Sequence, residues 1–152
     1  MLESVVKYLI ENHISISTME SCTGGLLASL ITDISDASTI LKFSAVTYST
    51  EYKIKMGVSR EVIDKYSVYS KETAIEMAKA IVKFTGSDLG VGITGKLTSN
   101  LNEEKGVDLC IYDKRNDNIY TTHVDITKST RKENKIEVIE AFINLFNSTI
   151  KS

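Results

Sequence analysis

The sequence predicts an α/β domain with a single mixed β-sheet covered by helices. Two observations lead to this prediction. Up to residue 95, segments with apolar residues at helical spacing alternate with short strand-like segments, as in a parallel sheet with helical connections. At residues 107–126, two strand-like segments follow one another around a polar turn, and such a pair is antiparallel. A sheet that holds both arrangements is mixed.

The composition is that of an ordinary globular domain. The chain has 152 residues, of which 42% are hydrophobic and 25% charged, enough for one domain with a sizeable core. The net charge of −2 gives no reason to expect direct binding of nucleic acid or of an anionic membrane. Cys22 and Cys110 lack metal-ligand spacing, so we expect free thiols in a reducing cytoplasm. We expect neither a signal peptide nor a membrane-spanning segment.

The part of the chain before residue 86 is expected to supply most of the helices. Apolar residues recur at helical spacing from Leu2 to Ile10, whereas Ile14–Met19 alternates as a strand does. Ser59 and Ser70 are typical helix N-caps. We expect helices over residues 2–12, 23–34, 50–56, 59–66 and 70–84, strands over 14–19 and 40–49, and helix ends at Gly57 and Gly86.

The remaining part is expected to complete the sheet and add one helix. Residues 89–94 have the continuous apolar character of a buried strand. Residues 107–112 and 118–126 are the paired strands around the turn at Asp113–Asp117. A final helix starts at Ser129. Its expected apolar face consists of Ile136, Val138, Ile139, Phe142, Ile143 and Leu145.

The segment Glu20–Gly25 joins a predicted strand to a predicted helix through a turn rich in hydroxyls and glycine. Free N–H groups at the start of a helix commonly hold phosphate or carboxylate groups, and glycine lets a ligand approach the backbone closely. The alternative is local: Ser21 or Thr23 is simply the N-cap of the helix. The segment is therefore a candidate anion site or a helix cap.

Three further polar segments lie at or between predicted strand ends: Asp36–Ser38, Tyr48–Lys53 and Gly92–Gly95. Ligands of α/β sheets gather at the carboxyl ends of the strands, so a site can assemble from these segments. Each also has a structural explanation, as an ordinary turn, a helix start or a glycine turn.

Together and in this order, these segments resemble the C-terminal domain of the competence/damage-inducible CinA proteins, the nicotinamide-nucleotide amidase (NMN deamidase) family. The resemblance runs through residues 1–95 and returns in the last helix, where Arg131 and Lys135 match two basic positions of the family. The matching segments are Glu20–Gly25, Asp36–Ser38, Tyr48–Lys53, Gly57–Val58, Val68–Glu72 and Asp88–Gly95.

The resemblance implies one three-layer α/β domain over residues 1–152, belonging to a cytoplasmic homodimeric hydrolase of the pyridine nucleotide cycle. Its reaction would be hydrolysis of the carboxamide of nicotinamide mononucleotide (NMN) to nicotinic acid mononucleotide and ammonia. It implies no metal and no cofactor, and a small nucleotide as the substrate.

Amide hydrolysis without a metal needs a nucleophile, a base and donors for the oxyanion. His13 and His123 are the only histidines, and neither forms a convincing cysteine–histidine pattern. The resemblance points to Ser38 as nucleophile, Lys53 as base and Tyr48 as an orienting hydroxyl. Ser21 is the rival nucleophile, because it lies in a sharp turn from a predicted strand to a predicted helix. It also implies substrate-binding roles for Glu20, Ser21, Thr23, Gly24, Gly25, Thr94, Gly95 and Arg131, although Arg131 is equally explained as a surface charge at a helix start.

Residues 96–105 depart from the family pattern, which has a glycine-rich, proline-containing stretch after the position of Gly95. A glycine-rich loop offers donors to an anion, and bulky, charged side chains offer fewer. Two alternatives therefore stand beside NMN hydrolysis. One is an amidase for a related amide, and the other is a non-catalytic interaction module linked to competence or DNA damage.

Overall fold

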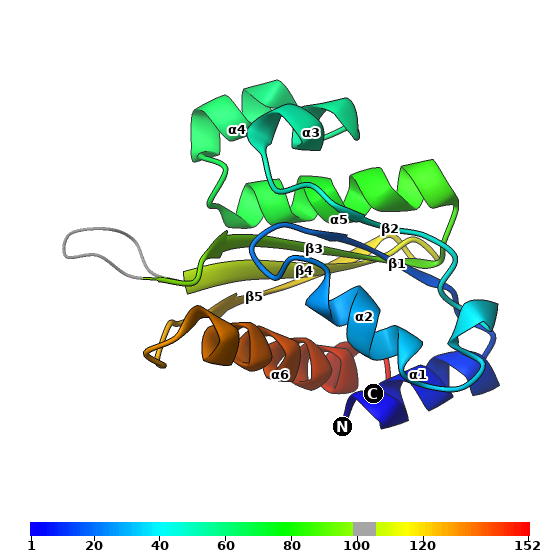
Figure 1. Cartoon of the computed structure of the whole chain (residues 1–152). Helices are drawn as coiled ribbons and strands as arrows, with labels where there is room; N and C mark the ends of the chain where they lie inside the picture. The colour runs from blue at the N-terminus through cyan, green and yellow to red at the C-terminus, as the bar shows by residue number, and fades with distance from the viewer. Residues whose placement is uncertain (99–105) are drawn as a thin grey trace.

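The computed structural model describes residues 1–98 and 106–152, and it shows three layers (Figure 1). A five-stranded sheet forms the middle layer, as predicted. One face carries α3 (Thr50–Lys55), α4 (Arg60–Tyr66) and α5 (Lys71–Thr85). The other face carries α1 (Leu2–Glu11), α2 (Leu26–Thr32) and α6 (Arg131–Thr149). A short 3₁₀ turn, η1, spans Ala37–Thr39.

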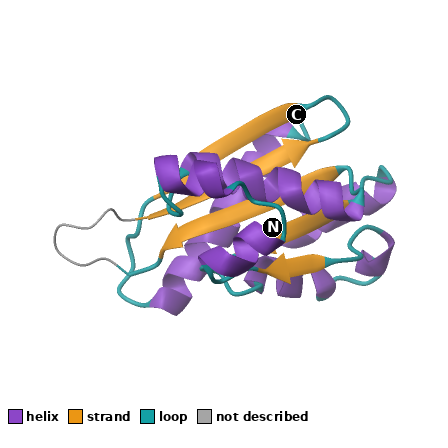
Figure 2. Ribbon diagram, turned by 90° about the horizontal axis from the view of Figure 1, so that it is seen from above, coloured by secondary structure: helices purple, strands orange, loops and turns teal. Residues whose placement is uncertain are grey.

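The sheet is mixed, with the strand order β2-β1-β3-β4-β5 (Figure 2). β1 (Ile16–Glu20) lies between β2 (Ser44–Val46) and β3 (Leu89–Lys96) and runs parallel to both. β4 (Gly106–Asp113) is antiparallel to β3 and to β5 (Asn118–Val124). Since Glu20 pairs with both Val46 and Ile93, the three parallel strands end side by side, which is where ligand sites of α/β sheets form.

Close packing of α5 on β3 fixes the central layer. A Cβ atom at Gly92 would lie 2.1 Å from the carbonyl oxygen of Ala74, and one at Gly90 would lie 2.3 Å from that of Ala78. These two glycines therefore let the helix backbone approach the strand more closely than any side chain would permit. Hydrophobic side chains of the opposite face, among them Leu27 and Phe142, form the larger core.

Most predicted elements are present, with local differences. Ser59 and Ser70 cap α4 and α5 as expected, accepting hydrogen bonds from Val62 N–H and Thr73 N–H. β2 is shorter than the predicted strand over residues 40–49. No helix within residues 1–98 and 106–152 combines the length and the apolar character that crossing a membrane requires.

The buried face of α6 differs from the prediction. The helix begins at Arg131 with Thr130 as N-cap, and its buried residues are Asn134, Val138, Ile139, Phe142 and Phe146. Ile136 is 50% exposed, contrary to the prediction. At about 100° per residue it lies some 200° around the helix from Asn134, on the side away from the sheet. The spacing of apolar residues therefore identified the helix but misplaced part of its face.

Candidate functional site

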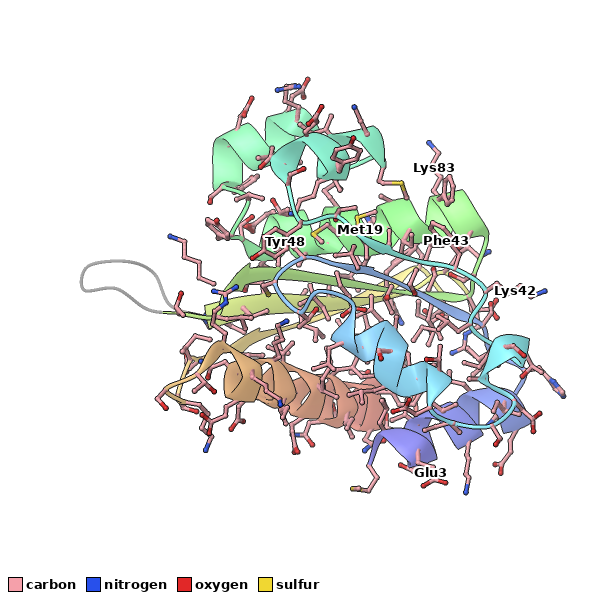
Figure 3. The ribbon with its side chains drawn as sticks, in the orientation of Figure 1. Glu3, Met19, Lys42, Phe43, Tyr48 and Lys83 are labelled. Atoms are coloured by element: carbon pink, nitrogen blue, oxygen red, sulfur yellow. The ribbon has the colours of Figure 1, made fainter. Side chains whose placement is uncertain are left out.

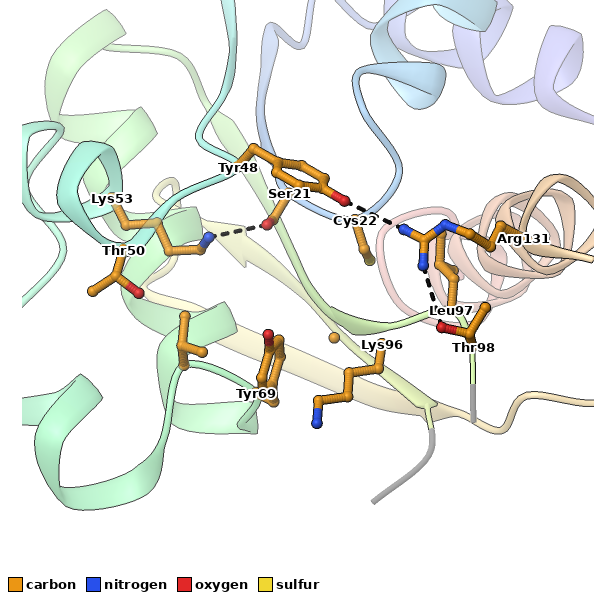
Figure 4. A pocket seen from close by; sticks show the side chains of 12 residues that line it. Ser21, Cys22, Tyr48, Thr50, Lys53, Tyr69, Lys96, Leu97, Thr98 and Arg131 are labelled. Carbon is orange, nitrogen blue, oxygen red and sulfur yellow. Dashed lines mark hydrogen bonds between the residues drawn. The ribbon is translucent and has the colours of Figure 1, made fainter. Parts of the chain in front are cut away.

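A cavity of about 260 Å³ lies beyond the carboxyl ends of β1 and β3 (Figure 4). Its wall is formed by the turn after β1, the start of α3, the segment before α5, the end of β3 and the first residue of α6. Its lining residues are Ser21, Cys22, Tyr48, Thr50, Lys53, Val68, Tyr69, Gly95, Lys96, Leu97, Thr98 and Arg131.

Lys53 and Ser21 form a hydrogen-bonded pair in the wall of this cavity. The Nζ atom of Lys53 donates to Ser21 Oγ at 3.0 Å and to the carbonyl oxygen of Thr47 at 2.7 Å. Lys53 is only 1% exposed, and this burial lowers the pKa of its amine. The pair therefore joins a candidate hydroxyl nucleophile to an amine that loses its proton more readily than that of an exposed lysine.

The local sequence explains how Lys53 reaches the end of β1. The backbone N–H of Thr47 donates to Glu20 O at 2.8 Å, so the chain after β2 stays beside β1. Ser49 then caps α3 by accepting from Tyr52 N–H. This short helix begins at Thr50, shortly after β2 ends at Val46, and directs Lys53 inward toward the turn that carries Ser21 (Figure 4).

Glu20 organises the turn after β1 from within the protein. Its carboxylate is fully buried and accepts hydrogen bonds from Leu27 N–H and Ala28 N–H, both at 3.0 Å. It also accepts from the hydroxyls of Thr23 and Thr18, at 2.7 and 3.1 Å. The predicted N-cap role of Ser21 or Thr23 is wrong, because the N-cap residue is Gly25 and Glu20 fills the first-turn amides of α2. The protein's own carboxylate thus occupies the place expected for a ligand anion.

Ser21 is held at the end of β1 by β3. Its backbone N–H donates to Ile93 O at 3.0 Å, and its carbonyl accepts from Gly24 N–H at 3.0 Å. Among the described residues, no other residue accepts a hydrogen bond from the adjacent N–H of Cys22, which interacts with the residue's own thiol. The Cys22 side chain is 5% exposed, and burial raises the pKa of its thiol to about 12. The thiol is therefore a poor nucleophile at neutral pH.

Arg131 reaches over the mouth of the cavity from the start of α6 (Figure 4). Its guanidinium donates to Tyr48 Oη at 3.3 Å and to Thr98 Oγ1 at 3.4 Å. The ammonium group of Lys96 lies 4.8 Å from the ring centre of Tyr69 on another part of the wall. The described lining residues include the cationic side chains of Arg131 and Lys96 and no carboxylate, so this part of the wall favours an anionic ligand.

The structure brings together only some of the predicted site residues. Ser21, Tyr48, Lys53, Gly95 and Arg131 line the cavity. Thr23, Gly24 and Gly25 line a neighbouring cavity of about 370 Å³ together with Lys132 and Lys135. Gly24 and Gly25 have φ values of 64° and 93°, which favour glycine.

Two other predicted residues are turned away from the cavity. Glu20 is buried beneath the turn, as described above. Thr94 is 1% exposed, and its hydroxyl donates to Val68 O at 2.8 Å. Thr94 thereby fixes the segment before α5, whose Val68 and Tyr69 line the cavity.

Ser38 lies at the opposite end of β1. It is exposed on η1, and the nearby Ile40 O accepts a hydrogen bond from the N–H of Ile16, the first residue of β1. Ser21 follows the last residue of that strand, and five residues of strand span about 15 Å. The segment before β2 lies at this amino end because β2 runs parallel to β1. The structure therefore pairs Lys53 with Ser21 and leaves Ser38 elsewhere.

Several lining residues were not singled out from the sequence as site residues. Tyr69 belongs to the Val68–Glu72 segment that matches the family, so a signal for it was present. Lys96 and Thr98 belong to the segment that departs from the family pattern. The rest of that segment, residues 99–105, lies outside the described residues. Within the described ranges, no group of three or more His, Cys, Asp or Glu side chains is placed to hold a metal ion.

Comparisons with known proteins agree with this architecture. Two solved structures share the fold: the competence damage-inducible protein A (ComA) from Klebsiella pneumoniae, with a TM-score of 0.88 and 20% identity, and CihA from Agrobacterium tumefaciens, with 0.82 and 26%. The first alignment covers 97% of this chain and 92% of the other, and the second covers 94% of each.

Sequence relatives carry CinA-type names. A CinA-like protein of Kosmotoga olearia is 46% identical over 94 residues, which are 61% of this chain and 23% of that protein. A putative competence-damage inducible protein of Clostridium novyi is 46% identical over 96 residues, 62% of this chain and 23% of that protein. The chain therefore spans only part of the length of these relatives. The model of the CinA C-terminal domain matches residues 1–150, and the chain belongs to this family.

Proposed function

We propose that this domain hydrolyses the carboxamide of NMN to nicotinic acid mononucleotide and ammonia, with Ser21 as the nucleophile and Lys53 as its base. The observation that carries the proposal is the distance of 3.0 Å between the buried Lys53 Nζ and Ser21 Oγ inside a cavity. A hydroxyl becomes an effective nucleophile when an adjacent base accepts its proton. Ser21 takes the role that the family resemblance gave to Ser38.

The proposed reaction has two stages. Ser21 Oγ attacks the carboxamide carbon while its proton passes to the neutral amine of Lys53. The tetrahedral intermediate collapses, the C–N bond breaks, and Lys53 returns the proton to the departing nitrogen, which leaves as ammonia. A water molecule then attacks the acyl ester on Ser21 with Lys53 again as base, and this releases the carboxylate product.

Backbone and cationic groups support the charged species of this reaction. The Cys22 N–H is adjacent to the nucleophile and donates to no other described residue, so it is the candidate donor to the oxyanion. Arg131 and Lys96 supply positive charge for the phosphate of the nucleotide. Tyr48 and Tyr69 offer aromatic surface for the nicotinamide ring.

Ammonia release from NMN by the purified protein tests this proposal. We expect turnover by the wild type and loss of at least about 10³-fold in S21A and K53M, the scale at which catalytic groups of a serine nucleophile act. S38A separates the two serines and should keep its activity. Activity in S21A, or its loss in a folded S38A, contradicts the assignment to Ser21, and circular dichroism establishes that each variant is folded.

A second substrate class is supported by Lys96 and Thr98, whose side chains stand in the wall where the family pattern has a glycine-rich stretch. Added side chains change the shape of a pocket and hence the amide that it accepts. A panel of nicotinamide riboside, nicotinamide and NAD, tested beside NMN, distinguishes this candidate. Turnover of another carboxamide with NMN inert would make the protein an amidase for a related amide.

A further inference from the structure

Asn134 is a polar residue on the buried face of α6. It is 2% exposed and lies in line with Val138 and Phe142, which belong to the hydrophobic core. Asparagine is a weak helix former, and burial of a carboxamide costs free energy unless its hydrogen bonds are made. An apolar residue would fit this helix face better, so the carboxamide calls for an explanation.

The carboxamide of Asn134 joins two segments that are distant in sequence. Its Nδ2 donates to Leu97 O at 2.8 Å and to Lys128 O at 3.2 Å. Its Oδ1 accepts from Lys128 N–H at 3.0 Å. One side chain therefore ties the end of β3 and the segment before α6 to the first turn of the helix.

One end of this bridge, Leu97, belongs to the wall of the cavity, and Asn134 itself lies beside Arg131 of that wall. Leu97 and its neighbour Thr98 line it, and Arg131 lies one helical turn before Asn134. Arg131 also reaches Thr98 Oγ1 at 3.4 Å, so the same helical turn contacts the end of β3 twice. The bond from Asn134 to Leu97 is short and buried, whereas the bond from Arg131 to Thr98 is long and exposed.

We propose that Asn134 is a positioning residue, which fixes the guanidinium of Arg131 and the Leu97–Thr98 wall relative to Ser21 and Lys53. This inference rests on the proposed function for its effect on catalysis. Arg131 binds the anionic part of the substrate, so loss of the bridge weakens substrate binding and leaves the Ser21–Lys53 pair intact. Small displacements of positioning groups are costly because binding energy depends on geometry.

Kinetics of N134A and N144A test the effect on the substrate. Asn144 is exposed on the same helix, so N144A is a matched control for the same change of side chain. We expect N134A to raise KM for NMN about tenfold with kcat within about threefold, and N144A to change neither. In an R131A background, N134A should have little further effect on KM. The proposal is overturned if N134A raises KM by the same factor in the R131A background as in the wild type. It is also overturned if N134A alone leaves KM unchanged.

NMR of the arginine Nε–Hε groups tests positioning without any substrate. The other arginines, Arg60 and Arg115, serve as internal references. We expect N134A to shift or broaden the signal of Arg131 alone and N144A to leave it in place. An unmoved Arg131 signal overturns the proposal. If the wild type is inert toward NMN, the proposed function fails and the NMR result decides on Asn134 by itself. Should N134A not fold, N134D with N144D as control repeats both measurements.

Discussion

The Nζ atom of Lys53 lies 3.0 Å from the Oγ atom of Ser21, although the two residues are 32 positions apart in the sequence. The parallel pairing of β1 and β2 produces this contact, because the turn after β1 and the helix after β2 both start at the same edge of the sheet. Tyr48, labelled in Figure 3, lies in the short segment that connects β2 to this helix. A buried amine beside a hydroxyl has consequences that can be measured.

The first consequence concerns the pH dependence of hydrolysis. Burial lowers the pKa of Lys53 from its usual value of 10.5, so its neutral form is present at lower pH than that of an exposed lysine. We expect kcat/KM for NMN to rise with pH and to level off at a pH below 10.5. K53R should be inactive at every pH, because a guanidinium does not lose its proton.

Lys55 provides the control for this measurement. It is exposed on the same helix and pairs with Glu51 at 3.2 Å, away from the cavity. K55R should reproduce the wild-type profile. A wild-type profile without a rise below pH 10.5, or activity in K53R, would contradict the role of Lys53 as base.

The same lowered pKa makes folding stability depend on pH. Between the lowered pKa of Lys53 and 10.5, the unfolded chain binds a proton at this residue that the folded chain does not. The contribution of Lys53 to stability therefore rises with pH through that window and is unfavourable below it. K53M lacks this dependence. Urea unfolding of both proteins between pH 7 and pH 10 should show K53M more stable at pH 7, with the difference shrinking as pH rises. A constant difference would show that the pKa is not lowered.

The elements of the fold were predictable because their signals are local. Ser59, Ser70 and Gly86 mark helix ends by their own hydrogen bonds or backbone angles, and the structure confirms all three. The position of Ser38 could not be found in this way. Its distance from Lys53 depends on which edge of the sheet the segment before β2 occupies, and strand pairing decides that.

The role of Asn134 at the site likewise could not be predicted from local sequence signals. Its partners Leu97 and Lys128 lie in other segments, so no periodic pattern identifies the bridge. Glu20 is a related case. It stands in the most specific segment of the chain, but its role in the structure is to hold α2 rather than to line the cavity. A motif can thus identify a site while misassigning its individual residues.

Replacing Glu20 by glutamine should destabilise the domain. One carboxylate oxygen accepts from Leu27 N–H and the other from Ala28 N–H, so the amide nitrogen of glutamine would face a donor in either orientation. The lost charge also no longer stabilises the positive end of α2. We expect E20Q to lose about 2–3 kcal/mol of unfolding free energy.

E140Q is the matched control for this measurement, since Glu140 is exposed on α6 and should change stability by less than about 0.5 kcal/mol. Urea unfolding at neutral pH measures both variants. Equal stability of E20Q and the wild type would show that the carboxylate does not hold the turn.

The two cysteines should resist alkylation in the folded protein. Cys22 and Cys110 are buried, and burial raises the pKa of each thiol to about 12. At pH 8 only about one thiol in 10⁴ is then ionised. Iodoacetamide at pH 8 should leave both unmodified by mass spectrometry and should not inhibit hydrolysis, whereas both react in denaturant. Rapid inactivation through Cys22 would point to a thiol nucleophile in place of Ser21.

Arg131 should recognise the phosphate of the substrate. Its hydrogen bonds within the described residues go to the neutral hydroxyls of Tyr48 and Thr98, and no carboxylate there pairs with it. A guanidinium without a counter-charge at the mouth of a cavity can bind an anion through two parallel hydrogen bonds.

We expect R131A to raise KM for NMN at least about tenfold, and to change KM for nicotinamide riboside, which has no phosphate, less than about threefold. R60A removes the same charge from an exposed helix start outside the cavity and should change neither. If R131A raised KM equally for both substrates, Arg131 would shape the cavity and would not bind the phosphate. The phosphate would then be expected in the neighbouring cavity lined by Gly24, Gly25 and Lys135.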